Sequence, residues 1–93
     1  DLAERTTEQI PDYAEAWDTL GWVYQQKQLP LLAIAPFEKA VSRDPENAVF
    51  HYHLGKAFAG AGDHAKAKES LQMALKLQPS FPDAEREMKA LEQ

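Results

Sequence analysis

The stretch Trp17–Tyr24, WDTLGWVY, returns 34 residues later as His51–Phe58, HYHLGKAF. Both copies place a leucine and a glycine side by side in the middle and an aromatic residue at the end. The same offset relates Pro11, Pro45 and Pro79. A fixed period of this length is typical of a repeat protein, in which each period is one supersecondary unit that packs on its neighbours.

Each period carries two helical patterns. Because an α-helix advances about 100° per residue, apolar residues three or four apart lie on one side of it. In the first period one such side consists of Trp17, Leu20, Gly21 and Tyr24. After a break a second side consists of Ala33, Phe37 and Ala40. Two amphipathic helices per period predict a helical hairpin.

The breaks between these patterns carry helix-start residues. The sequence predicts helices over residues 13–27, 31–43, 47–60, 64–77 and 82–92. Asp12 with Glu15 has the spacing of a capping box, in which two side chains satisfy free N–H groups at a helix start. Pro30 suits the first turn of the next helix, where its missing N–H costs little.

Other small and cyclic residues predict where helices end or approach. Gly60 and Gly62 predict the end of one helix, and Asp63 predicts the cap of the next. Pro36 falls inside a predicted helix, and we expect a local kink there on the outer surface. We expect close helix packing at four small residues, Gly21, Gly55, Ala33 and Ala67.

This combination resembles the tetratricopeptide repeat family, whose pattern is W-x₂-L-G-x₂-Y followed by A-x₃-F, A and P. Residues 14–47 match it throughout, with Trp17, Leu20, Gly21, Tyr24, Ala33, Phe37, Ala40 and Pro45. Residues 48–81 follow the same pattern at His51, Leu54, Gly55, Phe58, Ala67, Leu71, Ala74 and Pro79. Two of these positions depart from it, with His51 in place of the tryptophan and Leu71 in place of the phenylalanine.

The resemblance implies an all-α fold, a right-handed solenoid of antiparallel helix pairs forming a single domain over 1–93. About two repeat units, 14–47 and 48–81, would be followed by a capping helix at 82–93. Residues 1–12 would be the remnant of a preceding helix. The repeats also resemble the C-terminal part of longer bacterial proteins of this family, some of them associated with exopolysaccharide and exosortase systems. That likeness implies a cytoplasmic or periplasmic location.

The family's shared function is protein–protein binding, and the first helix of each pair lines a concave groove. Carried over residue by residue, the groove positions are Glu15, Asp18, Trp22, Gln25, Gln26, Val49, Tyr52, Lys56, Ala59, Gly60, Asp83 and Glu87. Some members clamp a peptide carboxylate with Lys, Asn and Arg. Here the matching region offers acids instead, with His53 between them, so we expect a partner that is neutral, apolar or basic rather than acidic.

The two tryptophans have different expected roles. Trp17 lies on the apolar side and is expected in the core, whereas Trp22 lies about 140° away between polar residues. Trp22 either packs on the neighbouring helix near Tyr52 or Lys56, or contacts a ligand or a second subunit. Aromatic residues carry much of the binding energy at interfaces, so Trp22 and Tyr52 are the first residues to mutate.

Composition excludes several function classes. The net charge is −5, the acidic excess lies in residues 1–26, and no basic stripe predicts nucleic-acid binding. No apolar run reaches the roughly 20 residues of a membrane span. His51 and His53 point about 200° apart on a helix, so we expect no metal ion. We expect no cofactor and no enzyme, because no nucleophile, base and oxyanion site converge.

Self-association is the alternative function. Two repeats are fewer than the roughly three that usually make a stable array. Leu2 and Ile10 would expose apolar surface at the N-terminal end, where a homodimer is the expected consequence. The chain would then be a structural segment of a longer scaffold, for instance in bacterial exopolysaccharide or envelope assembly.

Overall fold

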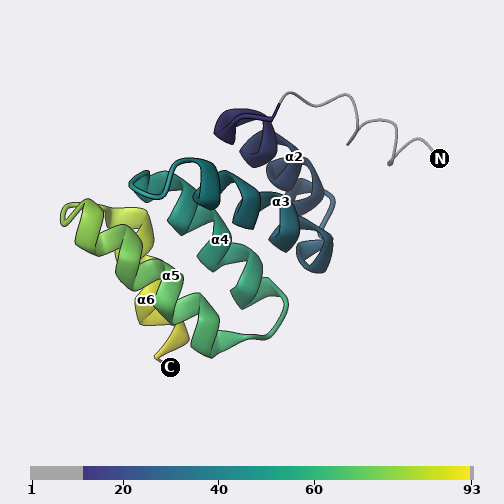
Figure 1. The fold of residues 1–93 in the computed structure, drawn as a ribbon. Coiled ribbons are helices and arrows are strands. Elements are labelled where there is room, and N and C mark those ends of the chain that lie inside the picture. The colour runs from purple at the N-terminus through teal and green to yellow at the C-terminus, as the bar shows by residue number, and fades with distance from the viewer. Residues whose placement is uncertain (1–11, 93) are drawn as a thin grey trace.

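The computed structural model describes residues 12–92, and within that range the secondary structure is helical throughout (Figure 1). The helices are α2 (Ala14–Gln26), α3 (Pro30–Arg43), α4 (Ala48–Gly60), α5 (His64–Leu77) and α6 (Pro82–Leu91). Each lies within two residues of its predicted span, and the all-α prediction is confirmed. The predicted remnant helix, with Leu2 and Ile10, falls outside the described residues apart from Asp12.

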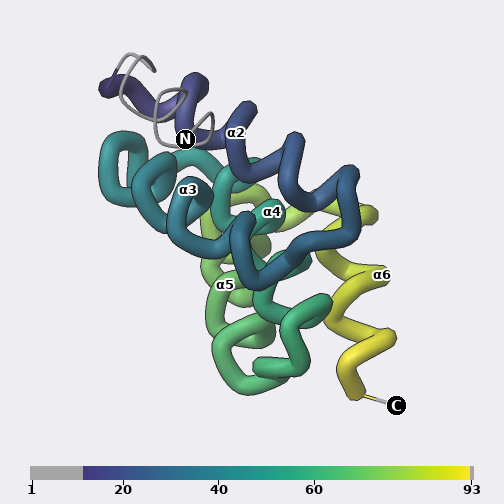
Figure 2. Tube along the Cα trace, turned by 90° about the vertical axis from the view of Figure 1, so that its right-hand side faces the viewer, coloured from purple at the N-terminus to yellow at the C-terminus, as the bar shows by residue number. Residues whose placement is uncertain are grey.

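Successive helices pack against one another as a solenoid of helix pairs. Helices α2 and α3 form one hairpin, α4 and α5 form the next, and α6 packs on α5 (Figure 1). Helix α3 also packs on α4, which joins the hairpins. Helix α4 touches both α2 and α6, so the first helix of each unit lies beside the first helix of the next (Figure 2). These three helices therefore form one side of the molecule.

Close packing within each hairpin depends on a glycine. A Cβ atom added at Gly21 would lie 2.5 Å from ring atoms of Phe37, and one at Gly55 would lie 2.9 Å from Cγ of Leu71. Phe37 and Leu71 are fully buried. The expectation of close helix packing is therefore confirmed at Gly21 and Gly55.

Several helix ends follow the sequence predictions. Pro30 begins α3, Gly62 adopts a left-handed backbone with φ of 88°, and the Asp63 carboxylate accepts a 3.2 Å hydrogen bond from the Lys66 N–H. Asn47, which we did not predict as a cap, accepts a bond of the same length from the N–H of Phe50 at the start of α4. Side-chain caps therefore begin both helices of the second hairpin.

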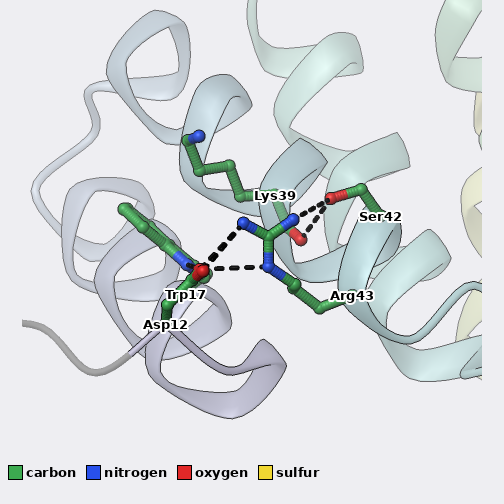
Figure 3. Close-up of polar contacts among 5 residues, drawn as sticks. All are labelled: Asp12, Trp17, Lys39, Ser42 and Arg43. Carbon is green, nitrogen blue, oxygen red and sulfur yellow. Dashed lines mark hydrogen bonds and ion pairs between the residues drawn. The ribbon is translucent and has the colours of Figure 1, made fainter.

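The predicted capping box at Asp12 and Glu15 is wrong. The residue before α2 is Tyr13, and its side chain makes no capping hydrogen bond within residues 12–92. The Asp12 carboxylate instead accepts a 2.9 Å hydrogen bond from Trp17 Nε1 and two 3.0 Å bonds from the Arg43 guanidinium (Figure 3). A charged, bidentate donor competes well against a backbone N–H, and Asp12 therefore ties the start of α2 to the end of α3.

The predicted position of Pro36 on the outer surface is also wrong. Pro36 is buried, and with Leu20 and Tyr24 of α2 it lines a hollow of about 230 Å³ between the two helices of the first hairpin. A pyrrolidine ring has no N–H to satisfy, so it is buried at little cost. The expected kink stays a prediction.

Candidate functional site

A row of aromatic rings crosses the side of the molecule formed by α2, α4 and α6. The ring of Trp22 on α2 lies 4.9 Å from that of His53 on α4, centroid to centroid. The rings of His53 and Tyr52 lie 5.7 Å apart, and Tyr52 lies 5.0 Å from Phe81 at the start of α6. We call these four residues the aromatic row. Tilted rings at these distances attract one another beyond their burial alone.

His53 is held at the centre of the row by Asp18. The His53 Nδ1 atom lies 2.9 Å and 3.1 Å from the two carboxylate oxygens of Asp18. An ionised carboxylate only accepts, so Nδ1–H donates. The buried ring of Phe37 lies 5.6 Å from the His53 ring and supports it from within the core. The imidazole is therefore fixed in place between α2 and α4.

A cation lies over two rings of the row. Lys56 Nζ lies 5.9 Å from the ring of Trp22 and 5.7 Å from that of Tyr52. Lys56 follows Tyr52 by one helical turn, so both side chains project from the same face of α4. An ammonium over an aromatic face is attracted by the negative charge density of the ring. This surface therefore already accommodates one positive charge.

Acidic side chains lie at the α6 end of the row. Burial raises the pKa of the Tyr52 phenol, and the negative charges of Asp83 and Glu87 raise it further. Both acids therefore lie close enough to act on the ring. Arg86 forms an ion pair with Asp83 one turn along α6. The rim beyond Tyr52 thus presents two carboxylates and one guanidinium.

The structure brings together about half of the predicted groove residues. Asp18, Trp22, Tyr52 and Lys56 belong to the aromatic row or touch it, and Asp83 and Glu87 lie at its end. The other predicted residues, Glu15, Gln25, Gln26, Val49, Ala59 and Gly60, have no recorded ring or hydrogen-bond contact with the row within residues 12–92.

Two of these six residues lie in surroundings that differ from those of a groove. The Gln25 Oε1 atom is buried and has no hydrogen-bond partner among residues 12–92, so it is not exposed to a binding partner. Gly60 packs near Pro30, where an added Cβ would lie 3.1 Å from the proline Cβ.

Both open interpretations of Trp22 describe part of its environment. Its ring packs on His53 and Lys56 of the neighbouring helix, yet 36% of the residue remains exposed. Trp17 is buried with Ala40 and Phe50, as expected for a core residue. Trp22 therefore has one face fixed by the protein and another open to solvent.

Sequence reasoning missed the central position of His53 and the participation of Phe81. His53 lies 35 residues after Asp18, one residue more than the repeat period. Adjacent first helices place such residues side by side, so an acid followed 35 residues later by a histidine was a usable signal. Phe81 gave none, because it comes before α6 and falls outside the family pattern.

Between residues 12 and 92, no group of three or more histidine, aspartate or glutamate residues is arranged to hold a metal ion. No helix in that part of the chain combines the length and apolar character needed to cross a bilayer.

Comparison with known proteins places the chain in a family. The tetratricopeptide repeat model matches residues 30–91. A Petunia hybrida protein named as a probable UDP-N-acetylglucosamine–peptide N-acetylglucosaminyltransferase SPINDLY is 36% identical over 64 residues, 69% of this chain. Those residues cover only 7% of the plant protein. With its 34-residue period and its stacked helix pairs, the chain belongs to the tetratricopeptide repeat family.

Proposed function

We propose that the aromatic row is the floor of a groove that binds a segment of another protein. The observation that carries the proposal is the half-open indole of Trp22, which begins a line of rings extending over three helices. Large aromatic residues are enriched at protein interfaces and supply much of the binding energy. The hydrogen bond between His53 and Asp18 fixes the floor before binding, which lowers the entropic cost of association.

We further propose that the bound segment is neutral, apolar or basic rather than acidic. Asp83 and Glu87 lie at one end of the row, and Glu15 is exposed on α2. Lys56 is already engaged with Trp22 and Tyr52, so its charge is spread over two rings. An arginine or lysine of the partner would meet the exposed face of Trp22 and the carboxylates beyond Tyr52.

Peptide capture tests both parts of this proposal. Basic, apolar and acidic peptide libraries of equal length are offered to the chain at low salt, and to Trp22→Ala. We expect the basic and apolar peptides to be preferred and Trp22→Ala to lose most of the binding. Val23→Ala is the matched control, because Val23 is an exposed apolar residue on the same helix outside the row. Equal capture of acidic and basic peptides would contradict the charge preference.

A second proposal, self-association within a longer scaffold, is supported by the exposed side of the first hairpin. Leu20 and Tyr24 are only half-buried, whereas their counterparts Leu54 and Phe58 are buried against α3. A further helix placed on α2 as α3 lies on α4 would complete their burial. A scaffold role in bacterial exopolysaccharide or envelope assembly, which the sequence resemblance implies, belongs to this second proposal.

Light scattering distinguishes the two proposals. A dimer that Leu20→Lys or Ile10→Asp converts to a monomer supports self-association. A monomer at all concentrations that still captures peptides supports the groove alone.

A further inference from the structure

The start of α3 exposes leucines where the corresponding part of α5 is polar. Leu31 is 74% exposed, Leu32 is 54% exposed and Leu29 is 42% exposed. Ala35, one turn beyond Leu31, is exposed as well. The residues 34 positions later are Ala65, Lys66, Asp63 and Glu69. We call Leu29, Leu31, Leu32 and Ala35 the leucine stripe. Exposed apolar residues gathered in one place indicate an interaction surface.

The hairpin itself does not require these leucines. The two hairpin turns have the same backbone feature, a positive φ of 61° at Gln28 and of 88° at Gly62. In the second hairpin Asp63 caps the following helix, whereas Leu29 in the first provides no side-chain hydrogen bond. The second repeat thus builds the same turn with polar residues, and the first gives up a cap to carry a leucine.

The stacking of repeats does not cover the leucine stripe either. Helix α3 covers Leu54 and Phe58 of α4, yet Lys66 and Glu69 of α5 remain exposed beside it. A helix stacked on α2 in the same way would cover Leu20 and Tyr24 and leave the leucine stripe open. The leucine stripe therefore lies outside the surface used for self-association, although the hollow of about 230 Å³ that Leu20 and Tyr24 line would be covered.

Two hollows meet at Leu32. One, of about 440 Å³, lies between the start of α3 and the end of α4, where Gly60 and Ala61 leave room. The other, of about 230 Å³, extends along α3 past Ala35 to Lys39. Among residues 12–92, Lys39 is the one charged residue that lines either hollow, and the exposed Glu38 beside it lines neither. The Lys39 Nζ atom lies 5.3 Å from the ring of Trp17, which lines the same hollow. The surface is thus apolar along two helical turns and positive at one end.

We propose that the leucine stripe and its two hollows form a second docking surface for an amphipathic helix of another protein. The hollows follow one another along α3 over the seven residues from Leu32 to Lys39, about 10 Å. Apolar side chains at helical spacing span that distance and fill both hollows. A carboxylate at one end of the segment pairs with Lys39. The preferred partner is therefore acidic and apolar, opposite in charge to that of the aromatic row.

A variant that copies the second repeat tests this proposal. Leu31→Ala, Leu32→Lys and Ala35→Glu together replace three of the four residues of the leucine stripe by residues that the same fold already carries on α5. The probe is a fluorescent synthetic helix with leucines at i, i+3, i+4 and i+7 and glutamates on its flanks, and fluorescence anisotropy measures its affinity. We expect the triple variant to bind it at least about tenfold more weakly than the unaltered chain, because two leucine contacts are lost.

Three further variants separate this surface from the groove and from a loss of structure. Lys39→Glu should reverse the preference between the glutamate probe and a lysine-flanked probe. Trp22→Ala should leave the affinity for the glutamate probe unchanged while weakening capture of basic peptides. Leu31→Asn alters only an exposed residue and should weaken binding severalfold without a change in the circular dichroism melt.

Four outcomes would overturn the proposal. The first is that neither probe binds, and the second is that the triple variant binds as well as the unaltered chain. The third is that the leucine stripe binds anionic phospholipid vesicles and not the peptide, in which case the surface recognises a lipid headgroup region. The fourth is that sedimentation shows a dimer that the triple variant abolishes, in which case the occupant is a second copy of this chain.

Discussion

The two hairpins share one backbone plan but satisfy it with different chemistry. In the first, Trp17 occupies a core position and donates its indole N–H to Asp12 at 2.9 Å. In the second, His51 occupies the same position and its Nε2 lies 2.8 Å from the Pro45 carbonyl. Because a carbonyl only accepts, that nitrogen donates. The comparison teaches that the position tolerates different rings provided that the buried polar atom is paired.

The hairpins also differ in how many helices pack against them and in whether side chains cap their helices. The α4–α5 hairpin has neighbours on both sides, α3 before it and α6 after it. Its helices both begin with side-chain caps, at Asn47 and Asp63. The α2–α3 hairpin has no capping side chain, and its leucine stripe is exposed. We infer that the second hairpin is built chiefly for stability and that the first gives up stability for binding.

The largest expected effect comes from removing the ring at the centre of the first hairpin. Phe37 is fully buried, packs on Gly21 and lies against His53, so Phe37→Ala should lower the free energy of unfolding by about 3–5 kcal/mol. Leu71→Ala, its counterpart, should cost about 2–5 kcal/mol and weaken peptide binding less, because Leu71 supports only the Phe81 and Tyr52 end of the row and not the ring beside Trp22. Urea unfolding followed by circular dichroism measures both. Equal losses of peptide binding in the two variants would contradict the link through His53.

The second expected effect is a difference in stability among the alanine variants of the three helical glycines, which depends on the space beside each glycine. Gly21→Ala should destabilise the chain by about 1–3 kcal/mol, because the new Cβ overlaps an immobile ring. Gly55→Ala should cost less, since Leu71 is 2.9 Å away and has side-chain bonds that can turn. Gly60→Ala meets only Pro30 and should be nearly neutral, because the gain in helix propensity, up to about 1 kcal/mol, offsets it. Thermal melts that reverse this order would show that the clash does not control stability.

The third expected effect transfers a cap from one hairpin to the other. Asp63→Ala should cost about 1 kcal/mol, because the Lys66 N–H loses its acceptor. Leu29→Asp places a carboxylate at the same position before α3 and should raise the free energy of unfolding by up to about 1 kcal/mol. It should also weaken binding of the acidic helical probe. A Leu29→Asp variant that is less stable than the unaltered chain would show that Leu29 has a packing role.

Sequence patterns predicted the hairpins because the repeat period and the residues that begin and end helices are features of the local sequence. The 34-residue offset located the repeats. Gly62 and Asp63 indicated a turn, because a left-handed backbone and a helix cap depend on the local sequence and not on the neighbouring helices. About half of the residues at or beside the aromatic row, among them Trp22, Tyr52 and Lys56, could be predicted through the family resemblance, which assigns positions on the first helix of each repeat. What failed depends on tertiary neighbours. Asp12 has an arginine 31 residues away as a better partner than its own helix.

The burial of Pro36 and the role of His53 had the same origin. Helical angles show that Pro36 lies beside Phe37, but only the position of α2 decides whether that side is covered. The pairing of His53 with Asp18 depends on the stagger between α2 and α4, which no single helix determines. The sequence therefore predicts which residues share a face, whereas the contacts between faces require the assembled fold.

The smallest expected effect is a loss of stability in acid that comes from Asp12 in the first hairpin. Hydrogen bonds from Trp17 and then Arg43 hold the pKa of Asp12 below its ordinary value of 3.8. The resulting stabilisation is fully present well above pH 3.8 and is lost as the pH falls through the lower pKa of the folded state. The effect should be small, because the Asp12 side chain is largely exposed and screened by solvent.

Melting temperatures at pH 7 and pH 3 measure this difference. Asp12→Asn should melt below the unaltered chain at pH 7. The gap should shrink at pH 3, because this pH lies below the ordinary pKa of 3.8 and the unfolded chain then takes up a proton that the folded chain resists. Glu46, its counterpart in the second hairpin, is exposed and has no recorded hydrogen bond or ion pair through its side chain within residues 12–92. Glu46→Gln should therefore leave the gap between the two melting temperatures unchanged. An equal response at Glu46 would show that the effect comes from net charge and not from the contacts of Asp12.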